Sequence, residues 1–279
     1  MRPVLLLTVP LALAISACAT RERPAEVTAA PVIAAERAFA ADGAQRGWVA
    51  AFRRAAAPDG MTLSPGPVNA QESLAQIEGD GPNTLDWRPA YAGIASSGDF
   101  GFTTGPFQIR GRDGIVGHYF TVWRRQPDGG WKWIFDAGTS VADPGPAVAA
   151  DAEIPTLPVA IESAGSADAA IGQIAALEAA ITTPDLMTRS LAHDARVNRP
   201  GAPAAIGRAA SAALVAADGQ LAYASLRRDA SSAGDMVFSL GEVRDQHEGA
   251  ERLRYYARIW QKRPEGWRIV FDEIVPVRG

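Results

Sequence analysis

One aromatic hairpin occurs twice in this chain, and the repeat limits what the chain can fold into. Residues 117–138 are GHYFTVWRRQPDGGWKWIFDAG, and residues 254–273 are RYYARIWQKRPEGWRIVFDE. Trp123 aligns with Trp260, 137 positions further on, whereas the tryptophans after the two turns are 136 positions apart. The one-residue difference falls in turns that contain Pro and Gly, where loop length varies at little cost. The simplest account is two domains derived from one ancestral unit.

The repeat extends upstream of the hairpins and indicates the domain boundaries. The Ser-Gly-Asp of residues 97–99 aligns with the Ala-Gly-Asp of residues 233–235. The segment between the repeats, residues 141–161, carries four prolines and is typical of a semi-rigid linker. We therefore expect one domain over residues 31–140 and a second over residues 162–277. Two domains suit a chain of 279 residues, because a domain commonly has about 100–150.

Each half places helical patterns before strand-like ones. In the second half, Ser166 can cap a helix whose apolar residues share one face, at Ile171, Ile174, Leu177 and Ile181. In the first half, Phe39, Trp48 and Phe52 indicate a helical region, with breaks expected at Gly43 and Gly47. Strand-like runs joined by glycine turns follow at residues 87–96, 100–109, 118–125 and 131–136. Helices that precede an antiparallel sheet indicate an α+β fold.

The first residues are typical of an exported protein. Arg2 precedes an apolar stretch that ends in ISAC at residues 15–18, which resembles the lipobox of bacterial lipoproteins. In that family the cysteine is lipidated on sulfur and becomes the mature N-terminus. We expect a signal peptide over residues 1–17, a polar tether over residues 18–30, and attachment to the lipid bilayer through Cys18. The alternative is an ordinary secretory signal with a chance cysteine.

The location implied by this resemblance is the periplasm, on the outer membrane rather than the inner one. Ala19 follows the cysteine, and it is not the aspartate that is associated with inner-membrane retention. Cys18 is the only cysteine of the chain, so no intramolecular disulfide can form. Apart from the first twenty residues, no apolar run approaches the roughly 20 residues needed to cross a bilayer.

Charge and motif content exclude several classes of function. The formal net charge is −4 and the basic residues form no block, so we expect no nucleic-acid partner. The three histidines, at positions 118, 193 and 247, have no metal-ligand spacing. No Gly-rich phosphate loop follows a strand. We therefore expect neither a metal nor a cofactor.

Four motifs in the first half carry a family resemblance by their order. They are ERAFA from residue 36, SGDFGFTTG from residue 97, YFTVW from residue 119 and GWKWIFD from residue 130. Together they resemble the nuclear transport factor 2-like superfamily, in particular its bacterial SnoaL-like and ketosteroid-isomerase-like domains of unknown function. The resemblance covers nearly all of the first domain and, more loosely, the second. It implies two cone-shaped repeats, each with helices packed in a curved antiparallel sheet, often around a pocket. Members include isomerases, cyclases, dehydratases and many non-enzymes, so the fold leaves the function open.

Alternation along the hairpins assigns the side chains to two faces. With Gln126 opposite Trp131 and Arg263 opposite Trp267, one face of each hairpin is mostly apolar and is expected to turn toward the helices. This face holds His118, Phe120, Val122, Trp131, Trp133 and Phe135, and in the second hairpin Tyr255, Ala257, Ile259, Trp267, Ile269, Phe271 and Glu273. The opposite, mixed faces carry Tyr119 with Trp123 and Tyr256 with Trp260, and place Arg258 across from Asp272 as an exposed pair. We expect the mixed faces to pack together as a pseudo-dimer within one chain.

The apolar faces supply the candidate site. Its pocket residues are expected to be His118, Phe120, Val122, Trp133, Tyr255, Ile259 and Glu273. A carboxylate in an apolar enclosure has a raised pKa, so Glu273 with Tyr255 nearby forms the candidate catalytic acid–base pair. The first domain has His118 and Ala137 at the matching positions, so its pair is incomplete. For Glu273 the alternative is a solvent-exposed carboxylate near the chain end, and for the aromatic residues it is an ordinary sheet core.

Three functions of different classes remain open. The first is a non-catalytic module that binds a small apolar molecule or another envelope protein, which the incomplete acid–base pair of the first domain favours. The second is an isomerase- or dehydratase-type enzyme that uses the apolar cone of the second domain. The third is a purely structural interaction protein whose cones are filled. A pocket volume separates the third from the other two.

Overall fold

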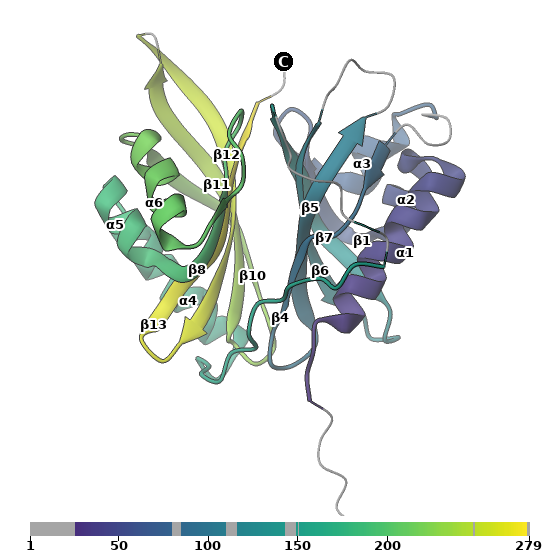
Figure 1. Cartoon of the computed structure of the whole chain (residues 1–279), viewed down its shortest axis with the longest axis horizontal. Helices are drawn as coiled ribbons and strands as arrows, with labels where there is room; N and C mark the ends of the chain where they lie inside the picture. Colours follow the sequence, from purple (N-terminus) through teal and green to yellow (C-terminus); the bar gives the residue numbers. More distant parts are fainter. Residues whose placement is uncertain are drawn as a thin grey trace, which may run out of the picture.

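Two β-sheets face each other in the computed structural model of the chain, and each carries its helices on the outer side (Figure 1). The structure describes residues 26–79, 85–109, 116–142, 149, 151–247 and 249–277. The expected signal peptide, the lipidation residue Cys18 and most of the expected tether therefore lie outside the described residues. Within the described ranges, no helix has the length and apolar character needed to cross a membrane. The predicted α+β class is confirmed, with helices and a mainly antiparallel sheet in each half.

The first half forms a sheet of strand order β2-β1-β7-β6-β5-β3, and β4 also pairs with β5. The neighbours are antiparallel except β1 and β7, which are parallel. The elements are α1 (Ala30–Arg46), α2 (Trp48–Ala55), β1 (Ala56–Leu63), β2 (Pro67–Asn69), α3 (Ala70–Ala75), β3 (Leu85–Trp87), β4 (Tyr91–Ile94), β5 (Phe100–Ile109), β6 (Val116–Arg125) and β7 (Trp131–Val141).

The second half repeats this plan in a sheet of order β10-β11-β12-β13-β8-β9, with β8 parallel to β13 as β1 is to β7. The predicted cap of its first helix is confirmed, because the Ser166 hydroxyl accepts a hydrogen bond of 3.2 Å from the Ala169 amide. The elements are α4 (Ala167–Ala180), α5 (Pro184–Ser190), β8 (Leu191–Asn198), β9 (Ala205–Ile206), α6 (Arg208–Ala217), β10 (Ala222–Ala230), β11 (Met236–His247), β12 (Ala250–Arg263) and β13 (Gly266–Pro276).

Of the two glycines expected to break the first helical region, only one does so. Gly47 has φ 90° and separates α1 from α2, as predicted. Gly43 lies inside α1, where the ring of Trp87 packs against it. A Cβ at residue 43 would lie 2.5 Å from that ring, so glycine is needed there for the close approach of an indole.

The hairpin register agrees with the prediction away from the turns. Arg258 lies opposite Asp272, and Ala257 lies opposite Glu273. Near each turn a β-bulge shifts the pairing, so that Trp123 lies opposite Trp133. A bulge inserts one extra residue and changes the face on which the following side chains lie. Trp133 therefore packs with Trp123 in the helix-side core, instead of sharing a face with Phe135 as predicted.

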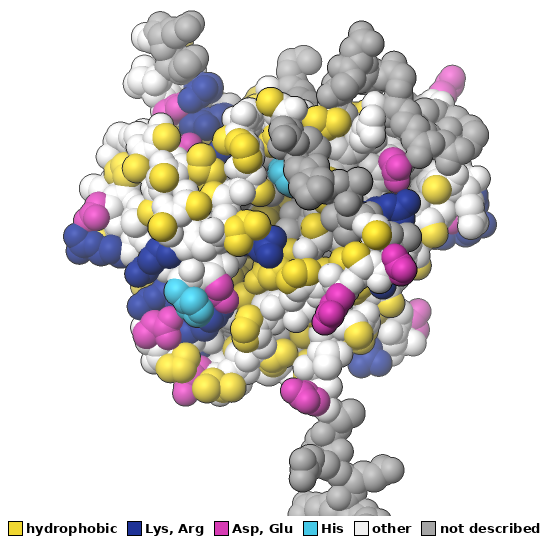
Figure 2. Space-filling view, in the orientation of Figure 1, with side chains coloured by type: hydrophobic (Ala, Val, Ile, Leu, Met, Phe, Trp, Pro, Cys, Tyr) yellow, Lys and Arg dark blue, Asp and Glu magenta, His cyan; other side chains and the backbone are white. Residues whose placement is uncertain are grey.

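The two faces of each hairpin point in directions opposite to the prediction. Phe120 of β6 stacks on Phe271 of β13, with ring centroids 4.2 Å apart and 18° between the planes. Phe135 of β7 packs against Phe238 of β11 at 5.1 Å. The mostly apolar faces thus bury each other between the sheets. In the space-filling view, hydrophobic side chains run across the middle of the molecule, where the two halves meet (Figure 2).

The mixed faces turn toward the helices. The indole nitrogen of Trp123 donates to Glu36 of α1 at 3.1 Å, and that of Trp260 donates to Glu178 of α4 at 3.0 Å. The physical reason is that indole and hydroxyl groups need partners when buried. A helix can supply a carboxylate, whereas a second sheet covered with phenylalanine cannot. The tyrosines and tryptophans expected between the sheets are therefore in the helix-side cores.

The contact between the two halves contains a reciprocal pair of hydrogen bonds. The amide of Ser96 donates to Asp235 at 2.7 Å, and the amide of Ser232 donates to Asp99 at 3.2 Å. These residues are the repeated Gly-Asp turns and the serines that precede them. Contacts in which residue i meets j and j meets i are typical of a two-fold interface. The linker adds to this contact, because its Leu157 amide donates to Ala92 of β4 at 2.8 Å.

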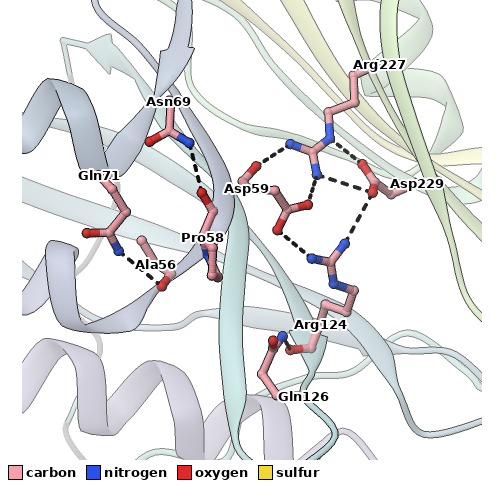
Figure 3. Close-up of polar contacts among 9 residues, drawn as sticks. All are labelled: Ala56, Pro58, Asp59, Asn69, Gln71, Arg124, Gln126, Arg227 and Asp229. Atoms are coloured by element: carbon pink, nitrogen blue, oxygen red, sulfur yellow. Dashed lines mark hydrogen bonds and ion pairs between the residues drawn. The ribbon is translucent and has the colours of Figure 1, made fainter.

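An ion cluster closes one margin of the interface (Figure 3). Asp59 of β1 forms ion pairs with Arg124 of β6 at 2.6 Å and with Arg227 of β10 at 2.8 Å. Asp229 of β10 forms ion pairs with Arg227 at 2.6 Å and with the more distant Arg124 at 3.5 Å. Two arginines and two aspartates thus bridge the halves. The groups are partly exposed, so we assign the cluster to orientation of the halves more than to stability.

We expect the chain without residues 1–25 to be monomeric in solution. The sheet faces through which two copies could pair are already covered by each other within one chain. Light scattering coupled to size-exclusion chromatography should give the mass of one chain at all loading concentrations. A dimer whose mass persists on dilution would contradict this expectation.

Candidate functional site

A cavity of about 650 Å³ opens inside the first domain, on the helix side of its sheet. This volume lies in the range of small-molecule sites, about 300–1,000 Å³. Most of the lining side chains are apolar or aromatic: Trp48, Phe52, Leu63, Pro65, Ile77, Leu85, Trp87, Phe107, Ile109, Tyr119, Ala137, Val275 and Pro276. The polar side chains in the lining are Thr62, Glu78 and Asp136.

Asp136 of β7 is the buried acid of this cavity. One carboxyl oxygen accepts a hydrogen bond of 2.6 Å from the Thr121 hydroxyl on the neighbouring strand. No cation pairs with the carboxyl in the described part of the chain, and the side chain is only 7% exposed. Burial, together with the charge of Glu36, holds the pKa of Asp136 well above its ordinary value. A neutral carboxyl of this kind can donate a hydrogen bond to a ligand.

Behind Asp136 lies a second buried acid, Glu36 of α1, which is 0% exposed. It accepts hydrogen bonds from the indole of Trp87 at 2.7 Å, the hydroxyl of Thr103 at 2.5 Å and the indole of Trp123 at 3.1 Å. Burial raises the pKa of Glu36 in spite of these donors. The carboxyl therefore fixes the aromatic wall of the cavity, because two of its three donors are indoles of that core.

The Tyr119 hydroxyl lies buried behind the cavity wall. It is buried and has no hydrogen-bond partner of good geometry among the described residues. Burial and the nearby charges of Glu36 and Asp136 raise the pKa of Tyr119 well above its ordinary value. The hydroxyl stays neutral at physiological pH and can donate or accept. Tyr119 lines the cavity with its aromatic part, because its hydroxyl oxygen has almost no accessible surface.

The second domain has the same helix-side acid but a different environment around it. Glu178 of α4 accepts from Trp260 and from the Ser239 hydroxyl, as Glu36 does from Trp123 and Thr103. Here, however, Arg228 also reaches the carboxylate, at 2.8 Å. Both domains therefore have the carboxyl that accepts from the tryptophan. Among the described residues, a cation pairs with this carboxyl in the second domain but not in the first.

The aspartates that correspond in the two hairpins also differ. Arg258 occupies the position of Thr121 in the repeat and pairs with Asp272 at 2.8 Å, and Arg199 pairs with Asp272 at 2.7 Å. Burial opposes ionisation of Asp272, but the two arginines outweigh it and hold its pKa below the ordinary value. The pair predicted as exposed is thus fully buried, at 1% and 0% side-chain exposure. Removing one partner of a buried pair costs about 3–5 kcal/mol, far more than an exposed pair is worth.

One further difference fills the second cone. Gly138 lines the cavity of the first domain, and the aligned residue of the second is Ile274. Ile274 is 0% exposed and packs with Leu221, Val243 and Tyr256 in a core cluster of its own. The arginine network and this cluster take up space on the helix side of the second sheet. The first domain therefore offers the better site for a ligand.

None of the seven predicted pocket residues lines the cavity of the first domain. Phe120, Val122 and Ile259 lie between the sheets, and Trp133 lies in the helix-side core. His118 is 8% exposed with its Nε2 unpaired among the described groups, and burial lowers its pKa. The physical reason is the exchange of faces described above: the apolar strand faces cover each other and are closed to ligands.

The predicted acid–base pair is also placed between the sheets. Glu273 is 0% exposed, so the alternative of a solvent-facing carboxylate is wrong. Its Oε2 accepts from the Asn198 amide at 3.0 Å, and its Oε1 has no partner among the described groups. Burial, with the charge of Asp136 as a smaller cause, raises the pKa of Glu273 to about 8. Tyr255 lies opposite Val275 in the register, and its hydroxyl reaches the turn at Gly66 of the first domain.

The residues that sequence reasoning missed are Asp136, Tyr119 and Glu36. Tyr119 was expected between the sheets, because the directions of the two hairpin faces were assigned the wrong way round. A signal for Asp136 was present in the repeat, since Thr121 stands where the second domain has Arg258. The aspartate is present in both repeats, but the arginine opposite it is present only in the second. The aspartate of the first repeat is therefore a candidate for a separate role. His193 and Asp194 lie in β8, where Asp194 pairs with Arg263 at 3.0 Å.

Across the described residues, no group of three or more His, Cys, Asp or Glu side chains lies close enough together to hold a metal ion.

No family model matches the chain, and no curated protein matches it. Solved structures do. An NTF2-like protein with a cystatin-like fold from Novosphingobium aromaticivorans is 23% identical, covers 39% of this chain and 82% of its own, and has a TM-score of 0.31. An NTF2-like protein of unknown function from Pseudomonas putida is 15% identical, covers 40% and 89%, and has a TM-score of 0.34. A ketosteroid isomerase-like protein from Erwinia carotovora is 17% identical, covers 43% and 99%, and has a TM-score of 0.31.

These matches name the same kind of protein as the sequence resemblance, and each spans about the length of one of the two repeats. At these identities and TM-scores they are likenesses in fold alone. The chemistry of the site rests on the residues described above.

Glu273 should make the free energy of unfolding depend on pH. Its pKa in the folded chain, about 8, lies above the ordinary 4.5, so its contribution is fully present below about pH 4.5 and is lost as the pH rises toward 8. The slope from one such group is at most about 1.4 kcal/mol per pH unit. In urea unfolding, Glu273→Gln should therefore gain stability relative to wild type between pH 5 and pH 8.

The matched control is Glu265→Gln in the exposed β12–β13 turn, whose curve should run parallel to wild type. Comparison with wild type removes the contributions of Asp136, Arg199 and Asp272, the other charges acting on Glu273. Parallel curves for Glu273→Gln and wild type would show that Glu273 is ionised normally in the fold.

Proposed function

We propose that the chain is a binding protein for a small, mostly apolar molecule, held in the cone of its first domain. The observation that carries this proposal is the contrast between the two repeats. The first domain keeps an apolar cavity of about 650 Å³ with an acid that no cation among the described residues neutralises. In the second domain the corresponding acid is neutralised by Arg258 and Arg199.

The polar groups of the cavity indicate which hydrogen-bonding groups the ligand carries. A neutral Asp136 donates a hydrogen bond, so the ligand presents an oxygen acceptor such as a carbonyl. Tyr119, which also lines the cavity, supplies an aromatic contact. Apart from Thr62 and the exposed Glu78, the other lining side chains are aromatic or aliphatic, so the body of the ligand is apolar. A cationic amine would instead have to ionise Asp136 in a buried site.

A catalytic alternative rests on the same residues. A carboxyl whose pKa is raised by burial can shuttle a proton, and isomerase- or dehydratase-type chemistry requires such a group. If the protein is an enzyme, Asp136 in the first domain is the better acid than Glu273, because Asp136 lines the cavity and Glu273 does not. A purely structural protein with both cones filled is the least supported of the three, because the first cone is hollow.

We expect a neutral fluorescent ketone such as prodan to bind in this cavity and to accept a hydrogen bond from Asp136. Asp136→Leu should weaken binding several-fold, because a typical hydrogen bond contributes about 1 kcal/mol. It should also shift the emission of bound prodan to the blue, since the carbonyl loses its donor. Fluorescence titration measures both quantities.

Asp128→Leu, in the exposed turn of the first hairpin, is the matched control and should bind as wild type does. Absence of saturable binding to wild type would overturn the binding function. Unchanged affinity and emission in Asp136→Leu would remove Asp136 from the site.

The second part of the proposal concerns location. The lipobox-like ISAC sequence and the sole cysteine support attachment of the mature chain to a membrane through lipid on Cys18. A polar tether would then hold the two domains off the bilayer surface, in the periplasm and on the outer membrane. In this position the domains could pass an apolar molecule to the membrane, or contact another envelope protein.

Cys18→Ser should abolish lipid attachment and move the chain from the membrane fraction to the soluble fraction. The reason is that the acyl chains are the expected source of membrane affinity. Fractionation with mass spectrometry of the N-terminal peptide measures both effects, and Ser16→Ala, two residues before the cysteine, is the control. A Cys18→Ser chain that remains with membranes, together with an unmodified wild-type peptide, would refute the anchor.

A further inference from the structure

The cavity of the first domain is not built by the first domain alone. Val275 and Pro276, at the end of the last strand of the second domain, line it together with residues of α2, β1 and β7. Val275 is only 3% exposed, so it is enclosed where it meets the first domain. Both residues lie at the end of β13, more than a hundred residues further along the chain than β7, the last strand of the first domain. Part of the wall is therefore contributed across the domain boundary.

This part of the wall is fixed in place. Val275 lies opposite Tyr255 in the β12–β13 register. The Tyr255 hydroxyl packs against Gly66, where a Cβ would lie only 2.8 Å from it, and the adjacent Pro65 also lines the cavity. On the other side, the Gly201 amide of the second domain donates to the Ser140 carbonyl at the end of β7, at 2.9 Å. Residues of the strands next to the closing strand, Tyr255 of β12 and Gly201 after β8, thus contact the first domain.

We propose that the cavity is a composite site, in which the second domain supplies the closing wall and Val275 limits the size of the ligand that fits. This inference rests on the binding function proposed above and adds a role for the second domain. Because the side chains of Val275 and Pro276 offer no hydrogen bond, the part of the ligand that meets them is apolar. A ligand that touches both domains stabilises their docking, because it binds the docked arrangement better than a separated one.

The composite wall also accounts for features of the second domain that its own cone leaves unexplained. Its cone contains a buried ionic network and a packed cluster around Ile274. These packed neighbours hold β13 in position, and β13 carries the residues that line the cavity of the first domain. Ile274 itself precedes Val275 and points to the opposite side of the strand. One residue thus holds the strand to the second domain, and the next meets the cavity of the first.

The test uses the whole chain and prodan as the probe. Val275→Trp should fill the cavity from the second domain and reduce prodan affinity about tenfold or more, because small changes of volume in an apolar pocket are worth about 1–3 kcal/mol. Val277→Trp, two residues further on and outside the lining, should leave affinity unchanged. Leu63→Trp fills the cavity from the first domain and should also abolish binding.

The outcomes separate the two proposals. Loss of binding in both Leu63→Trp and Val275→Trp supports a composite site. Loss in Leu63→Trp with full affinity in Val275→Trp overturns the composite wall and leaves the binding function standing. No saturable binding to wild type overturns both. Should Val275→Trp fail to fold by near-ultraviolet circular dichroism, Val275→Thr replaces it, since it keeps the shape and adds a hydroxyl. Threonine should weaken binding several-fold, and unchanged affinity would overturn the composite wall.

Discussion

The burial of two phenylalanine-rich sheet faces against each other is the interaction on which the rest of this structure depends. Phe120 on Phe271 and Phe135 on Phe238 join sheets that are far apart in the sequence. Either half alone would expose a large apolar patch to water, which soluble domains avoid. Once these faces are covered by each other, the buried tryptophans of the mixed faces and their carboxylate partners are accommodated on the helix side. The polar networks and the cavity are both there for that reason.

The helix-side cores of the two domains differ, although the two domains have the same fold. Both domains retain a helix carboxylate that accepts from a strand tryptophan, Glu36 with Trp123 and Glu178 with Trp260. This anchor fixes the helix on the sheet in each copy. The copies diverge two residues before the tryptophan on the same strand, where threonine or arginine faces the aspartate. An arginine at this position fills space and neutralises charge, whereas threonine is smaller and uncharged, so the first domain has a cavity with an acid whose pKa burial raises.

The sequence was sufficient for the architecture because the information for it is local or periodic. The Ser166 cap, the break at Gly47 and the opposition of Arg258 to Asp272 follow from short-range chemistry and from matching two hairpins. The assignment of faces was wrong because alternation divides a strand into two sides without saying what covers each side. A bulge beside Trp123 altered the phase as well. The cavity requires contacts between α2, β7 and β13, and no sequence pattern encodes such a distance.

The fusion of two repeats in one chain permits an asymmetry that a symmetric dimer cannot have. In a homodimer both cones would carry the same residue opposite the aspartate, so both would be hollow or both filled. Here one copy is hollow, and the other, with Arg258 and Ile274, is packed. Linking the copies also makes their contact intramolecular, so the wall at Val275 does not depend on protein concentration. A site with one wall from a second domain needs that domain in place at all times, and the covalent link between the domains ensures that it is present in every chain.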